Sequence, residues 1–168
     1  DADGLAEAIR ISAGTLTQAH TSIEQAATMF STANRYYNDP NYLGNTAKIG
    51  SLRLRASEDS DAKNELEQLG ESVDDVSQSA SKLQEKLLKL TGVDIMEEDG
   101  KTFKSFYQQL LEISEVMDDL SDTDRANVLE TIFGKARAAG GAALISGMKE
   151  SADAYNTAIN SAGSATKE

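Results

Sequence analysis

The sequence predicts an all-α protein, a multi-helix bundle with at most a very short extended turn segment near residues 92–103. It has 168 residues with one Pro and no Cys or Trp, and it is rich in Ala, Leu, Glu, Ser and Lys, which favour helices. Apolar residues recur three and four positions apart along most of the chain, the spacing of one helix face. A chain of this length is expected to hold one ordinary core, in one domain or two small helical lobes.

Residues 1–57 are predicted to form an N-terminal helical lobe. Three helices are expected in it, over residues 5–13, 21–37 and 41–56. Gly14 is a natural C-terminal residue for the first helix, and Thr21 with Glu24 fits a capping box that begins the second. Pro40 follows turn-forming residues that end the second helix, and it suits the first turn of the third.

Residues 58–160 are predicted to form the second lobe, although the two lobes could also be one continuous domain. After an acidic break at 57–61, apolar residues from Leu66 to Leu90 keep a 3–4 heptad spacing that permits a coiled coil. The flanking positions are mostly Gly, Ser and Gln, and Gly70 offers a point of division into two helices. An amphipathic helix or helical pair packing on the same chain is therefore favoured over an intermolecular coiled coil. Within this face, the candidate contacts to a partner are Leu83 and Leu87.

The stretch 92–137 is expected to hold the main core. Val93 and Ile95 alternate with polar neighbours and precede the turn dipeptide at 99–100, so a few residues here are predicted to be extended. Helical spacing then resumes from Phe103 to Leu120. Four of the nine Phe and Tyr residues lie in this stretch, and aromatic side chains bury large areas.

Two further helices complete the prediction. Ser121 can cap a helix over 122–133, with acidic residues at its positive end. A run of small residues after Lys135 allows close helix packing and continues as a helix to Ile159. Residues 161–168 have lost the periodicity and are predicted to be a linker or a frayed end.

The charge and composition limit the possible classes of protein. The net charge of −12 repels nucleic acid and anionic membranes at long range, so no direct nucleic-acid contact is expected. No apolar run approaches the roughly 20 residues of a membrane-spanning helix. The chain begins at Asp1 without a signal peptide, so we expect a piece of a longer protein.

No catalytic, cofactor-binding or metal-binding residues are predicted, and the chain is not expected to be an enzyme. His20 is the only histidine, and a surface position on a helix is its expected role. The acidic clusters are interpreted as solvated turns and helix N-termini, because the calcium-loop pattern fails at Asp124, where a glycine belongs. No glycine-rich phosphate loop follows a strand.

Two basic segments stand out from the acidic background. Arg53 and Arg55 lie in one, and Lys135 and Arg137 lie in the other. Charge complementarity within the protein, or favourable placement at helix ends, is preferred over ligand contact. The four residues are nonetheless candidate partner contacts, and at least one of the two arginines at 53 and 55 is expected to be exposed.

Several segments, taken in order, resemble the core region of phage tail tape measure proteins. They cover most of residues 1–163 and comprise Asp3-Gly-Leu-Ala-Glu-Ala-Ile, Tyr36-Tyr-Asn-Asp-Pro40, Thr46-Ala-Lys-Ile-Gly-Ser-Leu-Arg-Leu-Arg55, Lys63-Asn-Glu-Leu-Glu, Leu90-Thr-Gly-Val-Asp-Ile-Met96, Thr102-Phe-Lys-Ser105, Asn127-Val-Leu-Glu130 and Gly134-Lys135. One departure is Ala136-Arg137-Ala-Ala-Gly-Gly141, where many relatives place Arg-Asn or Arg-Gln directly after Gly-Lys.

The resemblance implies a structural protein of a long-tailed phage or prophage. Such a protein sets tail length while the tube polymerises around it, and it leaves the tube ahead of DNA. The implied partners are the tail tube and tail assembly chaperone proteins, with self-association as a further option. The implied location is the lumen of the tail tube in the virion, after synthesis in the bacterial host cytoplasm. The alternative is a helical adaptor or secreted effector fragment that binds a partner through its heptad face.

Overall fold

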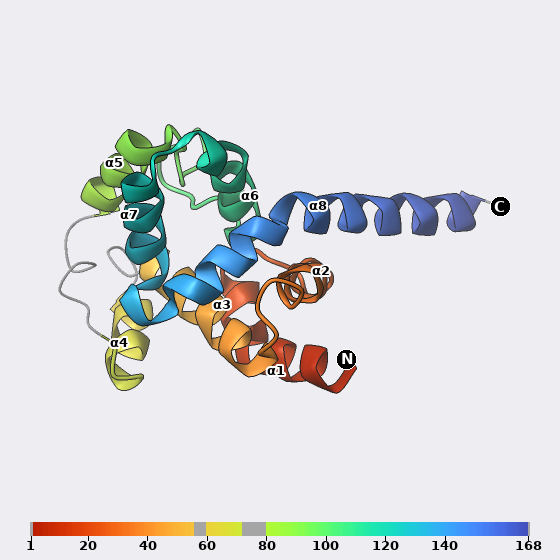
Figure 1. Ribbon diagram of the computed structural model, residues 1–168. Helices are drawn as coiled ribbons and strands as arrows, with labels where there is room; N and C mark the ends of the chain where they lie inside the picture. The colour runs from red at the N-terminus through yellow and green to blue at the C-terminus, as the bar shows by residue number, and fades with distance from the viewer. Residues whose placement is uncertain (1, 56–59, 72–79, 168) are drawn as a thin grey trace.

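The computed structural model describes residues 2–55, 60–71 and 80–167, and within these residues it contains eight α-helices and no β-strand (Figure 1). The all-α prediction is therefore confirmed. The helices are α1 (Ala2–Gln18), α2 (Ile23–Ala33), α3 (Pro40–Arg55), α4 (Ser60–Gln68), α5 (Ala80–Thr91), α6 (Phe106–Val116), α7 (Asp122–Phe133) and α8 (Ala138–Lys167). Short 3-10 turns follow α6 and α7, over Met117–Asp119 and Lys135–Arg137.

The extended segment predicted near 92–103 is present as one antiparallel bridge between Met96 and Phe103. The Glu97 N–H donates to the carbonyl of Thr102 at 2.7 Å, which closes the turn. At the tip, the Asp99 carboxylate accepts from the backbone N–H and the hydroxyl of Thr102, at 2.8 and 2.6 Å. These hydrogen bonds hold the pKa of the Asp99 carboxyl below its ordinary value, the Thr102 hydroxyl having the largest effect.

Helix α1 is longer than predicted because it passes through Gly14 and continues to Gln18. An exposed glycine inside a helix weakens it by only about 1 kcal/mol relative to alanine, and packing on other helices outweighs that. Close packing of α1 on α3 is visible at Gly44, where an added Cβ would lie 3.0 Å from the Cα of Ala8. The predicted stop at Gly14 is therefore wrong.

The predicted capping box is shifted by one residue. Ser22 is the N-cap of α2, where its hydroxyl accepts from the N–H of Gln25 and the Gln25 side chain accepts from the N–H of Ser22. Thr21 is buried instead, and its hydroxyl accepts from the N–H of Tyr107 at 3.1 Å. The local pattern predicted Thr21 as the cap, but Thr21 instead accepts a hydrogen bond from α6, and Ser22 caps α2.

The α1–α2 loop (residues 19–22) joins the N-terminal helices to the start of α6. The N–H of Tyr107 donates to the Thr21 hydroxyl, as described above. The N–H of Phe106 donates to the carbonyl of Ala19 at 3.0 Å. Ser105 caps the next position by accepting from the N–H of Gln108. The first N–H groups of α6 therefore find acceptors, two of them from a loop far away in the sequence.

A single hydrophobic cluster spans both predicted lobes. The first 57 residues contribute Leu16, Met29 and Leu43, and the later residues contribute Ile95, Phe106, Leu110, Ile113, Phe133, Leu144 and Met148, among others. A second, smaller cluster joins α3 to α4 through Ile49, Leu52, Ala62 and Leu66. The acidic break proposed at 57–61 lies partly outside the described residues, as does the middle of the heptad segment at 72–79.

The Phe133 ring of α7 packs against both α3 and α8. It is fully buried, and glycines of two other helices lie against it, Gly50 in α3 and Gly141 in α8. A Cβ at Gly50 would lie 2.6 Å from ring carbons, so only glycine leaves the space that the ring fills. The small-residue run after Lys135 therefore serves close packing, as predicted.

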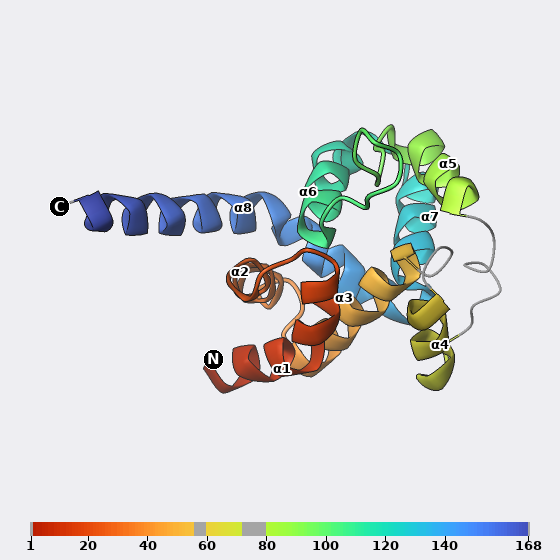
Figure 2. The same cartoon turned by 180° about the vertical axis from the view of Figure 1, so that it is seen from behind.

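Helix α8 has an inner part within the body and an outer part that projects from it (Figures 1 and 2). Its 30 residues correspond to about 45 Å of helix. From 153 to 162 every described side chain is exposed except Tyr155, which is half-buried. The helix continues to Lys167, so the predicted linker or frayed end at 161–168 is helical up to that residue.

Candidate interaction surface

Arg53, a predicted partner contact, is buried inside the chain. Its side chain is only 3% exposed, and its Nη2 donates to the carbonyls of Glu130 and Thr131 at 3.3 and 3.2 Å. Gly134, with φ of 80°, ends α7 beside the guanidinium group. Arg53 thus binds the last carbonyls of α7, whose partial negative charge favours a cation.

Arg55 is also buried, at 8% exposure, so neither arginine of this segment lies on the surface. It lines a cavity of about 190 Å³, called the inner cavity below, together with Gln18, Ala19, His20, Ser51, Phe103, Lys104 and Gln109. The expectation that at least one of the two arginines is exposed is therefore wrong. Both helix faces at the end of α3 are covered, one by α7 and the other by the α1–α2 loop and α6.

Lys135 is exposed, and Arg137, two positions later, is half-buried beside Tyr42. The guanidinium carbon of Arg137 lies 5.4 Å from the centre of the Tyr42 ring, within the range of a cation–π interaction. The Tyr42 hydroxyl donates to the carbonyl of Ala136 at 2.9 Å, and the Tyr37 ring lies 4.9 Å from that of Tyr42. We call Tyr37, Tyr42, Lys135 and Arg137 the Tyr42 surface.

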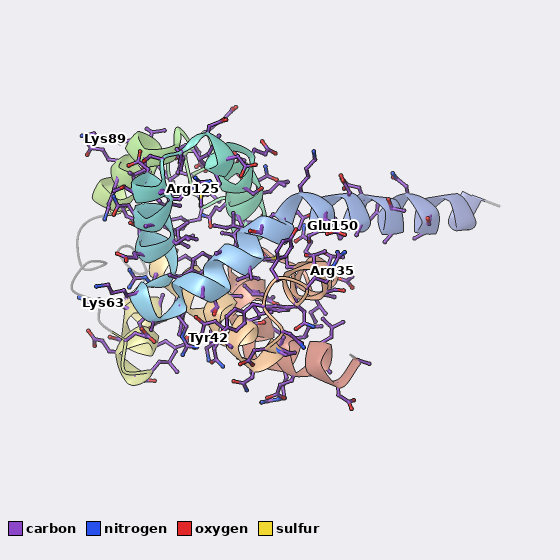
Figure 3. All side chains as sticks on the ribbon, in the orientation of Figure 1. Arg35, Tyr42, Lys63, Lys89, Arg125 and Glu150 are labelled. Carbon is purple, nitrogen blue, oxygen red and sulfur yellow. The ribbon has the colours of Figure 1, made fainter. Side chains whose placement is uncertain are left out.

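The Tyr42 surface has the composition of a protein-binding site. Tyr and Arg are over-represented among the residues that dominate binding energies. Tyr37 remains 40% exposed, while the hydrogen bond and ring contact fix the orientation of Tyr42. Sequence reasoning missed the two tyrosines, although their positions on either side of the Pro40 turn were a usable signal. Figure 3 labels Tyr42 below the inner part of α8.

Leu83 and Leu87, the candidate contacts on the heptad face, belong to the main core. They are 7% and 0% exposed and pack within the chain's own hydrophobic cluster. Leu88 and Leu69 are the leucines left 45% exposed. A partner could reach the predicted pair only if α5 left the core.

His20 lies just after α1 rather than on a helix surface, and its φ is 57°. The N–H of His20 donates to the carbonyl of Thr17, and the N–H of Thr21 donates to the carbonyl of Leu16. These two hydrogen bonds and the positive φ of His20 are the usual geometry of a helix C-terminus. Its side chain lines the inner cavity and also a larger, open hollow of about 570 Å³, called the outer hollow. The remaining lining residues of the outer hollow are Glu97, Thr102, Phe103, Lys104, Ser105, Gln108 and Glu112.

The projecting part of α8 carries a continuation of its buried stripe. Apolar residues keep the 3–4 spacing past the body, at Ala152, Tyr155, Ile159 and Ala162. The Tyr155 ring lies 5.8 Å from the Tyr107 ring, and Ile159 further along is 48% exposed. Burial raises the pKa of Tyr107, and the neighbouring Tyr155 and Asp153 raise it further.

An ion pair fixes α8 where it leaves the body. Arg35, just after α2, pairs with Glu150 of α8, and both residues are labelled close together in Figure 3. The hydroxyl of Ser151 donates to that of Thr28 at 2.9 Å. One helical turn earlier on α8, an added Cβ at Gly147 would lie 2.8 Å from the Thr32 hydroxyl of α2. The direction of the projecting part is therefore set by its packing on α2.

Within residues 2–55, 60–71 and 80–167, no three His, Asp or Glu side chains are grouped so that they could hold a metal ion. No helix in this part of the chain combines the length and apolarity needed to cross a membrane. Comparison with protein-family models, with curated proteins and with solved structures gave no match.

Proposed function

We propose that this chain is a structural module of a phage tail tape measure protein, involved in tail length determination, in tail tube assembly and in passage out of the tube ahead of DNA. The observation that carries the proposal is the series of segments, from Asp3 to Lys135, that resemble this family in its order. The module would act by binding and by its length, without catalysis.

The positions of those segments support the proposal. The segment 36–40 forms the turn between α2 and α3, and 46–55 forms most of α3. The segment 127–130 lies in α7, where Glu130 provides a carbonyl for Arg53. The segments that carry the resemblance therefore contribute to the same fold. A shared structural role would explain why they occur together.

The shape of α8 also supports the proposal. A helix that projects from a folded body, with its apolar stripe continuing to Ile159, suits a long helical protein that packs further helices along its length. The exposed Ile159 on this stripe offers apolar surface to another helix. The tube lumen in which a tape measure protein lies would confine such contacts along one axis.

We place contacts with the tail tube or the assembly chaperone at the Tyr42 surface. It combines two tyrosine rings with Lys135 and Arg137, and Tyr37 is accessible. The alternative function, an adaptor that binds through its heptad face, has less support because Leu83 and Leu87 are buried in the core.

The length of phage tails tests the proposal. In the phage or prophage that encodes this chain, tails would be measured by electron microscopy after deletion or tandem duplication of the segment. If the 168 residues are helical in the tail, each change shifts tail length by about 250 Å, at 1.5 Å per residue. A surface substitution such as Lys101→Gln is the length-neutral control.

Two results decide between the functions. Tails that shorten on deletion and lengthen on duplication support the ruler role. Duplication phages with tails of unchanged length would contradict it, because a ruler must transmit added residues to the tube.

A further inference from the structure

A third cavity, of about 190 Å³, lies where the first turn of α1 faces the end of α2 and the start of α3. We call it the α1–α2 pocket. Its lining contains none of the residues of the Tyr42 surface, so a ligand bound here would not use the contacts proposed there. The lining residues are Ala2, Leu5, Phe30, Ser31, Asn34 and Pro40.

The walls of the α1–α2 pocket are mainly apolar. Four of the six lining residues are apolar, and Phe30 among them is buried and belongs to the main hydrophobic cluster. Leu5 packs against the same cluster and stays half-buried. No charged side chain occurs among the described lining residues, so a charged ligand would lose water without meeting an opposite charge. The pocket therefore favours a neutral, largely apolar group.

One polar atom in these walls is left without a hydrogen bond. Oδ1 of Asn34 is buried, and no donor reaches it within the described residues. Asn34 is the C-cap of α2, where its backbone N–H donates to the carbonyl of Phe30 at 3.0 Å, so the backbone that carries this side chain is fixed by the helix. Most buried side-chain oxygens are hydrogen-bonded. An unpaired one in the wall of a cavity indicates a place for the donor of a ligand.

We propose that the α1–α2 pocket binds an indole ring, whose N–H donates to Oδ1 of Asn34. A buried apolar cavity of about 150 Å³ holds benzene, and the larger volume of this pocket leaves room for a second, fused ring. The ring would lie against Phe30 and Leu5. Contacts between aromatic rings stabilise a complex beyond the area that they bury, so Phe30 favours an aromatic ligand over an aliphatic one.

A tryptophan side chain of a partner protein and a small free indole share this chemistry. Trp is prominent among the residues that dominate protein–protein binding energies, and ligand pockets are typically apolar with a few polar groups that fix orientation. Ala2 and Ser31 are exposed, so the pocket opens to the surface beside them and leaves a path for a chain that carries the ring. The 168 residues contain no Trp, so the ring must come from outside them.

Titration followed by NMR tests the proposal. Indole, N-methylindole and N-acetyltryptophanamide would each be added to the ¹⁵N-labelled chain. Saturable shifts of the amides of Leu5, Ser31 and Asn34 are expected with indole, and N-methylindole should bind about 2–10-fold more weakly because it lacks the N–H. The same shifts with N-acetyltryptophanamide identify a side chain as the source of the ring, and shifts with indole but not with the amide identify a small free ligand. No shift with indole, or equal affinity for N-methylindole, overturns the proposal.

Substitutions separate the hydrogen bond from the fit of the ring. Asn34→Leu keeps the branched shape of the side chain but removes the acceptor, so the preference for indole over N-methylindole should disappear. Asn127→Leu makes the same change at an exposed position of α7 that does not line the pocket, and it should keep the preference. Circular dichroism checks that both variants are folded, and the comparison of ligands on the parent chain does not depend on either. A folded Asn34→Leu variant that prefers indole by the same factor would overturn the assignment of Asn34 as the acceptor.

Discussion

Alanine at either glycine that faces the Phe133 ring is expected to destabilise the protein, although alanine normally favours a helix. A Cβ at Gly50 would lie 2.6 Å from Cδ1 and Cε1 of the ring, and one at Gly141 would lie 2.6 Å from Cε2 and 2.7 Å from Cγ. Real Cβ contacts are not this short, so the ring or a helix must move. Because Phe133 is fully buried between α3 and α8, it has no free space to enter.

The magnitude follows from two opposing effects. Replacing a helical glycine with alanine gains about 1 kcal/mol, whereas forcing a methyl group into a packed core costs about 1–3 kcal/mol. Gly14 isolates the first effect, because it lies inside α1 with no atom within 4 Å of its added Cβ. Gly14→Ala should therefore be stabilised, and Gly50→Ala and Gly141→Ala should fall below it by about 1–3 kcal/mol each.

Urea unfolding followed by circular dichroism at 222 nm measures these differences. The Phe133→Leu substitution adds a direct test of the contact, since a smaller side chain leaves space for the new methyl group. Gly50→Ala combined with Phe133→Leu should lose less stability than the sum of the single changes, by about 0.5–3 kcal/mol.

Two results would refute the reasoning. If Gly50→Ala and Gly141→Ala are as stable as Gly14→Ala, the ring does not lie between the two glycines. If the double variant is additive, the loss comes from elsewhere in the helices.

Three further changes test the loop contacts. His20→Gly should raise the free energy of unfolding by about 1 kcal/mol, because φ of 57° is unfavourable for a side chain, and urea unfolding that shows a loss would argue against this backbone geometry. Thr21→Val should cost about 1–3 kcal/mol, since the N–H of Tyr107 loses its acceptor, whereas Thr21→Ser should cost much less in the same assay. The pKa of Asp99 lies below its ordinary value in the folded chain, so its contribution to stability is present above the unfolded pKa and is lost as pH falls through the folded one. Thr102→Val should move that pKa, followed by NMR, back toward the ordinary value, and an unchanged pKa would exclude the hydroxyl as its main cause.

The helices could be predicted from the sequence because each buries a face with regular spacing. The cap of α7 is an example, since Ser121 accepts from the N–H of Asp124 as expected from the local pattern. Local patterns failed where distant residues compete for the same group. Thr21 has every property of a cap, but its hydroxyl accepts from Tyr107, which is 86 positions away.

The candidate sites were harder to predict for the same reason. Arg53 and Arg55 are two positions apart and look alike in sequence, yet one binds the carbonyls of α7 and the other lines the inner cavity. The acceptors of Arg53 lie 77 and 78 positions further along the chain. The Ser51 hydroxyl gives no signal in the sequence, because its burial without a hydrogen-bond partner depends on how other segments pack against α3.

The bonds from the α1–α2 loop to α6 also determine when the N-terminal helices can be completed during synthesis. Thr21 leaves the ribosome 86 residues before Tyr107, which at 5–20 residues per second is a wait of roughly 4–17 s. Throughout that time the loop has no α6 to bind, and the faces of α2 that α8 later covers stay in water. Folding must then close a long segment before these contacts are gained, which slows it. Helices α1 and α2 are thus synthesised before the segments that complete their packing. During this interval a chaperone would find them accessible.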